Sequence, residues 1–301
     1  MSDAGRYSPP LNMGDVRLKP PPRLIPVSLR LHLIFGNGWS LLGWLVLGFG
    51  SIFFWSMAVN SDLTSWYVFR GELERREAQL IESWETGVSI GEEPVTGHRY
   101  TFSLSDGHSI EDTSYHTGEA ISVPQIVEIE YPQGKPEHSR ITGMRSAVMP
   151  LAGIFTSIPA IVGLVFACIG FRKGRYNARL LEVGEMARGK LLTKEPTNVR
   201  VNDQTVYKLT FSFTASDRRA YTASAKTHNT ALLESEEGEW IVYDPYFPEQ
   251  AVLIDSLPGT PGIGADGLFQ GKSKAAVILV LFVPVLVGAG TIVCLAHVLQ
   301  P

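Results

Sequence analysis

The sequence predicts a membrane protein of mixed α and β class. We expect three transmembrane helices together with two repeated small antiparallel β-barrel or β-sandwich domains of about five strands each. Two observations support this fold class. Three long segments contain no Lys, Arg, Asp or Glu, and two strand-rich stretches share a sequence pattern. A chain of 301 residues is long enough for two ordinary domains.

The chain is expected to begin with a disordered, basic and proline-rich tail over residues 1–30, followed by a transmembrane helix over residues 31–59. An apolar helix of about 20 residues crosses a ~30 Å hydrocarbon core at ~1.5 Å per residue. The apolar run exceeds the roughly 7–15 residues of a signal peptide, and no small-residue cleavage site follows it. We therefore expect the first span to remain as an anchor.

Residues 62–85 are predicted to form an amphipathic helix that leaves the membrane. Its apolar positions are Trp66, Phe69, Leu73, Leu80 and Trp84. They recur at helical spacing, with glutamates and arginines between them. This face is expected to pack against the adjacent β domain, and a surface for a partner protein is the alternative.

The first β domain is predicted over residues 86–145. Residues 100–104 alternate between apolar and polar side chains, which is the period of a half-buried strand. The Asp106–Gly107 pair indicates a turn into a hairpin partner. Residues 86–90 form the expected leading strand, and a short strand closes the domain around Ile141.

A second β domain follows after one more span. Residues 146–171 form the second predicted transmembrane helix, residues 172–188 a basic exit helix, and residues 189–257 the second β domain. Residues 258–274 are a predicted Gly- and Pro-rich linker, and residues 275–298 the third transmembrane helix. The apolar block between the β domains is too short to cross a bilayer twice, which needs about 40 residues. The two domains are therefore expected to face opposite compartments.

Both β domains carry one turn pattern at a constant offset. Tyr131, Pro136, Glu137 and Ile141 match Tyr243, Pro248, Glu249 and Leu253, each 112 residues later. The tyrosines, prolines and glutamates of this pattern are candidate interaction residues. Proline cannot donate to a strand ladder, so each proline is expected to end the loop before the closing strand. Each glutamate is expected to accept backbone N–H bonds in the turn, and a pair of ligand-binding carboxylates is the alternative. Upstream, Phe102 is expected to match Phe211.

The repeated pattern resembles domain-of-unknown-function family 3592. The matching residues of the first copy are Gly87, Val88, Tyr100, Phe102, Asp106, Gly107, Tyr131, Pro136 and Ile141. Those of the second are Gly189, Tyr207, Phe211, Tyr243, Pro245, Pro248 and Leu253, with Asp217–Arg218 in place of the Asp–Gly turn. The resemblance implies a bacterial membrane protein with small β domains between spans, and it implies no reaction.

Basic residues beside the spans predict the orientation, because Lys and Arg near span ends favour the cytoplasmic side. They precede the first and third spans and follow the second, whereas Arg140 and Arg145 before the second span are the exception. We expect a multi-pass protein of the bacterial inner membrane, with its N-terminus cytoplasmic and its C-terminus outside. The cluster after the second span consists of Arg172, Lys173, Arg175 and Arg179. These side chains are candidates for binding lipid head groups, although orientation alone explains them.

Motifs for catalysis or cofactor binding are weak. Residues 262–267 spell G-x-G-x-x-G, but a proline-rich stretch precedes them, so we expect a flexible connector. The sequence contains no H-E-x-x-H motif of a helix-borne metal site. One hairpin gathers His98, His108, His116, Asp106, Glu111 and Asp112. Strand side chains alternate between faces, so a solvated hairpin is favoured over a metal site.

The sequence thus predicts a non-catalytic integral membrane protein without a cofactor, which presents a small β domain on each membrane face for binding, assembly or signalling. Its expected partners are the lipid bilayer and a protein partner or a second copy of the chain, and not nucleic acid. An accessory subunit of a membrane protease or transporter is the first alternative, by analogy with other tethered β domains. A membrane-bound hydrolase is the second alternative.

Overall fold

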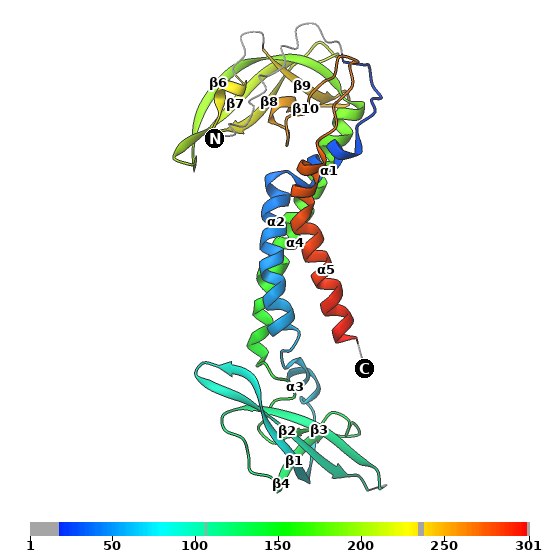
Figure 1. Ribbon diagram of the computed structural model, residues 1–301, viewed down its shortest axis with the longest axis vertical. Coiled ribbons are helices and arrows are strands. Elements are labelled where there is room, and N and C mark those ends of the chain that lie inside the picture. The colour runs from blue at the N-terminus through cyan, green and yellow to red at the C-terminus, as the bar shows by residue number, and fades with distance from the viewer. Residues whose placement is uncertain (1–17, 106, 234–237, 300–301) are drawn as a thin grey trace, which may run out of the picture. The chain divides into compact units, whose positions relative to one another are not determined.

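The computed structural model describes residues 18–105, 107–233 and 238–299. The chain divides into two compact units (Figure 1). Gly48–Ile161 forms one, and Met1–Leu47 with Val162–Leu299 forms the other. Each unit contains one five-stranded antiparallel sheet, so we call them the first-sheet unit and the second-sheet unit. The predicted pair of five-stranded antiparallel domains is confirmed at this level.

Three helical segments are long and apolar enough to cross a membrane. The first, Gly38–Ala58, consists of α2 (Gly38–Phe53) and the short π-helix η1 (Phe54–Ala58). The second, Leu151–Val183, consists of the 3-10 helix η2 (Leu151–Thr156) and α4 (Ser157–Val183). The third is α5 (Lys274–Val298). Large apolar side chains are exposed on all three, among them Leu45, Leu164 and Ile278. Such a surface suits hydrocarbon better than water.

The first predicted span begins too early at residue 31. Residues 31–35 belong to a separate helix, α1 (Val27–Phe35). Asn37 starts the next helix, because its Oδ1 accepts a hydrogen bond from the Ser40 N–H at 3.0 Å. Leu29 and Leu33 of α1 are fully buried against the second sheet and the end of α4. The charge-free run over residues 31–35 therefore reflects burial in protein, which hydropathy alone does not distinguish from burial in lipid.

The described part of the predicted disordered tail is ordered. The Arg23 guanidinium donates hydrogen bonds to the carbonyls of Leu181 at 3.1 Å and Gly184 at 2.8 Å. These carbonyls lie at the C-terminal end of α4, where backbone acceptors lack helical partners and cations are favourable. Residues 18–30 are thus held by α4, and residues 1–17 lie outside the described residues.

Glycine allows α2 and α4 to pack backbone against backbone. A Cβ atom added at Gly43 of α2 would collide with the backbone of Ala167, and one added at Gly163 of α4 would collide with the backbone of Leu47. Small residues permit this close approach of apolar helices. Replacing either glycine would push the two helices apart.

The first sheet contains β1 (Leu73–Ile90), β2 (Glu93–Ser103), β3 (Ser109–Thr117), β4 (Gln125–Pro132) and β5 (Arg140–Ile141). The strand order is β3-β2-β1-β4-β5. The long central strand β1 pairs with β4 along its first half and with β2 along its second. Beyond β5, Arg145 pairs with Tyr115 of β3 through backbone hydrogen bonds of 2.8 and 2.9 Å. This bridge links the outer strands of the sheet.

The predicted amphipathic helix over residues 62–85 is wrong for most of its length. Only α3 (Leu63–Val68) is helical, and residues 73–85 belong to β1. Helix-forming residues are common in this stretch, but β1 is hydrogen bonded to a strand on each side, and such tertiary pairing overrides local propensity. Charged residues of β1 reach exposed partners, as in the 2.6 Å ion pair between Glu82 and Arg99 of β2.

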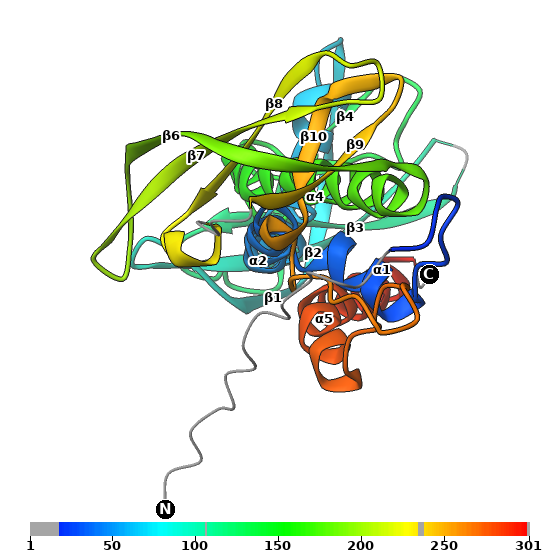
Figure 2. The same cartoon turned by 90° about the horizontal axis from the view of Figure 1, so that it is seen from above.

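The second sheet contains β6 (Glu185–Val201), β7 (Gln204–Thr214), β8 (Ala220–Thr227), β9 (Glu239–Asp244) and β10 (Phe247–Leu253) (Figure 2). Its order is β10-β9-β6-β7-β8. Read from the other edge this is β8-β7-β6-β9-β10, so the strands follow one another as β3-β2-β1-β4-β5 do in the first sheet. The expected boundaries shift here. The helix ends at Val183 instead of residue 188, and the sheet begins at Glu185 instead of residue 189.

The two sheets also share their register. Leu80 pairs with Tyr100 in the first, and Leu191 pairs with Phe211 in the second, at a constant offset of 111 residues. Both central strands break register immediately after this pair. Phe211 therefore occupies the position of Tyr100, and the expected match of Phe211 to Phe102 is wrong. A sequence alignment tolerates a shift of two residues in a strand, because the shift preserves which face each side chain occupies.

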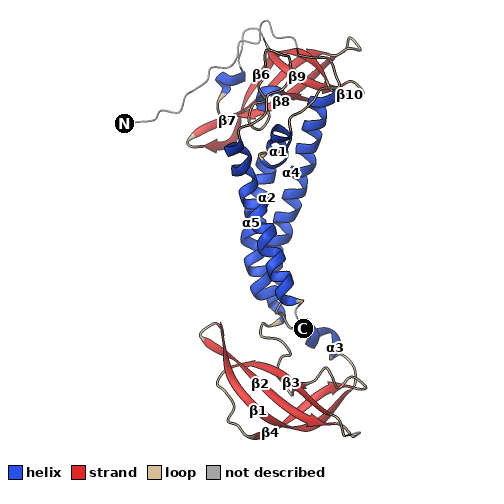
Figure 3. Cartoon of the chain, turned by 45° about the vertical axis from the view of Figure 1, so that its right-hand side comes forward, coloured by secondary structure: helices blue, strands red, loops and turns tan. Residues whose placement is uncertain are grey.

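Residues 258–274 are packed and do not form the expected flexible linker. Ile263 and Phe269 face one another across an isolated β-bridge, and both are buried in a core with α1 and the end of α4. Gly267 donates its N–H to the Gly264 carbonyl at 2.9 Å, so the glycine-rich stretch forms a turn. Figure 3 distinguishes these loops from the strands and helices.

Candidate functional site

A buried polar network lies on the inner face of the first sheet. Alternate residues of β2 point to this face, and Thr96, His98 and Tyr100 on it are all fully buried. Phe102 continues the row and is 4% exposed. A small β core is normally apolar, so three consecutive inward polar side chains mark this region.

Two histidines and one serine form a hydrogen-bonded chain in this network. Ser83 of β1 stands opposite His98 in the ladder, and its Oγ lies 2.8 Å from His98 Nδ1. The other ring nitrogen, His98 Nε2, lies 2.8 Å from Nδ1 of His116 on β3. Three adjacent strands thus each contribute one member of the chain.

Burial keeps both imidazoles neutral. Desolvation, reinforced by the neighbouring His116, lowers the pKa of His98 to about 4. Desolvation also lowers the pKa of His116, and the nearby Arg145 guanidinium adds to this effect. Arg145 itself donates to Thr117 Oγ1 at 3.2 Å. The histidine pair is therefore an uncharged hydrogen-bonded unit at neutral pH.

A second polar chain ties β3 to the segment before β5. Asp112 Oδ2 accepts hydrogen bonds from the Ser139 hydroxyl at 3.0 Å and from the Ser139 N–H at 3.1 Å. Ser139 Oγ also lies 2.9 Å from the Tyr100 hydroxyl. Burial, with Asp112 as the second cause, raises the pKa of Tyr100 well above its ordinary value. Nearby, the Ile141 N–H donates to Ser114 Oγ at 2.8 Å.

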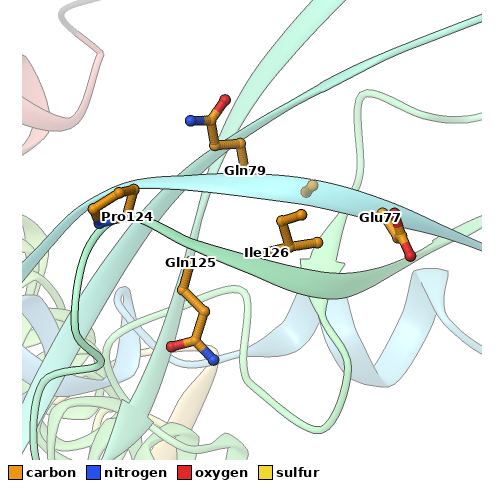
Figure 4. A pocket seen from close by; sticks show the side chains of 6 residues that line it. Glu77, Gln79, Pro124, Gln125 and Ile126 are labelled. Atoms are coloured by element: carbon orange, nitrogen blue, oxygen red, sulfur yellow. The ribbon is translucent and has the colours of Figure 1, made fainter.

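The hydroxyl–imidazole–imidazole chain is an arrangement that can move a proton. A serine beside a neutral histidine, which a third group orients, is also the general arrangement of an activated nucleophile. A hollow of about 530 Å³ in the same unit is lined by Glu77, Ala78, Gln79, Pro124, Gln125 and Ile126 (Figure 4). It does not include Ser83 or either histidine. Figure 4 shows the amides of Gln79 and Gln125 pointing to opposite sides of the strand pair.

The structure brings together only part of the predicted histidine and carboxylate cluster. His98 and His116 meet, whereas His108 is exposed at the start of the hairpin's second strand and Asp106 lies outside the described residues. Among the described residues, no group of three or more His, Cys, Asp or Glu side chains is placed to hold a metal ion.

The two tyrosines of the turn pattern occupy equivalent places. The Tyr131 hydroxyl donates to Glu74 Oε2 at 2.9 Å, and the Tyr243 hydroxyl donates to Glu185 Oε2 at 2.7 Å. In both sheets the tyrosine and the glutamate are direct partners in the ladder. Burial, followed by the glutamate hydrogen bond, raises the pKa of each tyrosine.

The prolines and glutamates of the turn pattern do not occupy equivalent places. Pro136 and Glu137 lie in the loop between β4 and β5, as expected, but Pro248 and Glu249 lie inside β10. The tight turn before β10 instead uses Asp244, whose Oδ1 accepts the Tyr246 N–H at 2.9 Å. Within the described residues, the Glu137 and Glu249 carboxylates accept no hydrogen bond, so the predicted capping role is wrong.

The predicted lipid-binding cations separate on α4. Arg172 and Arg175 line a groove between α2 and α4, whereas Lys173 and Arg179 do not. All four side chains are exposed. The groove belongs entirely to the second-sheet unit.

Sequence reasoning missed Ser83 and Ser139 as members of the buried network. The alternation of Thr96, His98 and Tyr100 along one strand could have indicated a polar row on one face of the sheet. Their partners on β1 and before β5 could not be found in this way, because these depend on strand register and on the path of a loop. Comparison of the chain with family models, curated proteins and solved structures found no match.

Proposed function

We propose that the protein is a non-catalytic, three-span membrane protein that presents one β domain on each side of the bilayer for binding, assembly or signalling. One observation carries the proposal. Leu151–Val183 is the only apolar helical segment among the described residues between β5 and β6, and most of its large apolar side chains from Phe155 to Phe171 are exposed. A single crossing between the two sheets would put them in different compartments.

The distribution of charge supports one orientation. Basic residues occupy the β6 end of the helical segment Leu151–Val183 and precede the third segment, which favours a cytoplasmic second sheet and an external first sheet. The inner membrane of a bacterium is the proposed location, in line with the resemblance to family 3592, which stays a prediction. The shared strand order and register support a further proposal, that the two sheets are copies of one duplicated unit.

A cysteine-labelling experiment tests the crossing. Ser105 and Ser216 are exposed in hairpins of the two sheets. Each would be replaced by cysteine in a chain whose native Cys168 and Cys294 are replaced by alanine. An impermeant maleimide applied to intact spheroplasts should label the cysteine at 105 and spare the one at 216 until the membrane is opened. Equal labelling of both sites in intact cells would contradict the proposal.

The Ser83–His98–His116 chain favours one alternative, a membrane-bound hydrolase that uses Ser83 as its nucleophile. A fluorophosphonate probe separates the two functions, because it reacts with activated serines. On the main proposal the wild-type chain and the Ser83→Ala variant remain equally unlabelled. Labelling of the wild-type chain that disappears in Ser83→Ala would favour the hydrolase.

A further inference from the structure

A groove on the apolar helices combines two chemically different ends. It has a volume of about 860 Å³ and lies between Trp44 of α2 and one face of α4. Leu164, Cys168 and Phe171 line its apolar part, and Arg172 and Arg175 line the other part. Ala167, buried where Gly43 lets the two helices touch, also lines it.

The sequence of α4 produces this polarity along one stripe. Leu164, Cys168, Phe171 and Arg175 follow one another at spacings of 4, 3 and 4 residues, so they share a face of the helix. The apolar members come first and the cations last. The groove is therefore apolar along most of its length and positively charged at one end.

The two arginines are available to an external anion. Within the described part of the chain, neither Arg172 nor Arg175 forms an ion pair with a carboxylate. Two other cations of this unit have partners: Arg30 pairs with Glu182 at 3.1 Å, and Arg23 donates to backbone carbonyls. Arg175 lies 5.7 Å from the Phe171 ring centroid, which places its guanidinium beside the apolar part of the groove.

We propose that this groove binds one anionic phospholipid, with an acyl chain along Leu164, Cys168 and Phe171 and the phosphate between Arg172 and Arg175. Guanidinium groups bind phosphate oxygens through two parallel hydrogen bonds, and the adjoining apolar channel matches a hydrocarbon chain. A soluble phosphate would leave that channel empty. The inference rests on the proposed membrane crossing, which puts the groove in contact with lipid and its cations at the end of the apolar run.

Lipid retention by the full-length chain tests this site. The protein would be purified in mild detergent with dioleoyl phosphatidylglycerol or dioleoyl phosphatidylcholine, and bound lipid would be counted by native mass spectrometry. We expect one phosphatidylglycerol to be retained and phosphatidylcholine to be lost. Arg172→Gln with Arg175→Gln should lower lipid retention about tenfold or more. The reason is that each basic residue near a membrane surface contributes about 1 kcal/mol to binding an anionic lipid, and about 1.4 kcal/mol corresponds to a tenfold change.

Two further variants make the result specific. Lys173→Gln with Arg179→Gln removes the same charge from the same end of α4 outside the groove, so this control should retain the lipid. Cys168→Trp fills the apolar part without changing charge, and it should also release the lipid. Equal loss in both double variants, equal retention of the two lipids, or displacement by excess inorganic phosphate would overturn the site.

Failure of the lipid site can be distinguished from failure of the proposed function. Maleimide labelling at positions 105 and 216 in the same variants reports the crossing independently of lipid retention. A chain that crosses the membrane but shows no preference for phosphatidylglycerol contradicts only the lipid site. A chain that labels equally at both positions contradicts the membrane arrangement on which the site depends.

Discussion

The two sheets have one strand order and one register but opposite interiors. Where the first sheet has buried His98, Tyr100 and Ser114 and the partly buried Asp112, the second has Leu209, Phe211, Ala225 and Ala223 at the same ladder positions, each 111 residues later. Leu209 and Phe211 are 0% and 1% exposed. The backbone pairing is thus independent of the chemistry it encloses. A polar interior is stable only where each group has a partner, whereas an apolar interior has no such requirement.

The largest expected effect comes from making the second interior resemble the first. Leu209→His would place an imidazole at the position that His98 has in the first sheet. Its neighbours there would be Lys194 and Thr227, which occupy the positions of Ser83 and His116. Loss of apolar packing and an unpartnered buried polar group should lower the stability of this sheet by about 4 kcal/mol. Hydrogen exchange of β7 amides in the full-length chain would measure it.

Leu192→His provides the matched control, because Leu192 is 62% exposed and should change stability by less than about 0.5 kcal/mol. If Leu209→His also costs less than about 1 kcal/mol, the second interior accepts polar groups, and the contrast between the sheets has no energetic basis.

The second effect is a pH dependence of the first sheet, whose histidine pair is replaced by Leu209 and Thr227 in the second. The folded pKa of His98 is about 4, below the unfolded value of 6.5. Between these values the unfolded chain binds the extra proton, so stability is full above pH 6.5 and falls as pH decreases toward 4. At about 1.4 kcal/mol per pKa unit, the loss is up to about 3 kcal/mol.

Hydrogen exchange at pH 7 and pH 5, corrected for intrinsic rates, would compare β2 with β7. Only β2 should lose protection. His98→Leu introduces the residue that the second sheet has at this position, Leu209, and should remove most of this pH dependence. A pH-sensitive β7, or a His98→Leu variant with an unchanged pH response, would show that the histidine pair is not the cause.

A smaller effect is expected from the second polar chain. Ser139 is 2% exposed and its hydroxyl contacts both Tyr100 and Asp112. Ser139→Ala leaves the buried Tyr100 hydroxyl and the partly buried Asp112 carboxylate without this partner and should lower the stability of the first sheet by about 2 kcal/mol. Ser105→Ala removes an exposed hydroxyl that accepts from Arg76 at 3.1 Å, and should cost less than about 0.5 kcal/mol. Equal losses measured by hydrogen exchange of β3 would remove the distinction between the two serines.

The smallest effects test the likeness between the sheets. Tyr131→Phe removes one hydrogen bond, to Glu74, and should cost about 1 kcal/mol. Tyr243→Phe removes the bond to Glu185 and also the acceptor of the Ser216 N–H at 3.0 Å, so it should cost about twice as much. The exchange rates of β4 and β9 amides would give both values. A larger loss for Tyr131→Phe would mean that the two tyrosines have different roles.

The sequence by itself determined the features that depend on short-range pattern. Charge-free runs located the three apolar helices, and period-two alternation located β2 and β7. The Tyr131 and Tyr243 match also survived, because it marks the same ladder position in each sheet. These features depend on residues close together in the sequence, where local sterics and hydrophobicity act directly.

The tertiary structure alone decided the features that depend on distant partners. Residues 73–85 form a strand because β2 and β4 pair with them, although the local sequence favours a helix. Ser83, His98 and His116 meet because register aligns three strands, and a shift of one residue would turn each side chain to the other face. Arg172 and Arg175 differ from Lys173 and Arg179 only because α2 packs on one face of α4. Register and helix packing are long-range choices, set by burial of the whole surface rather than by any local motif.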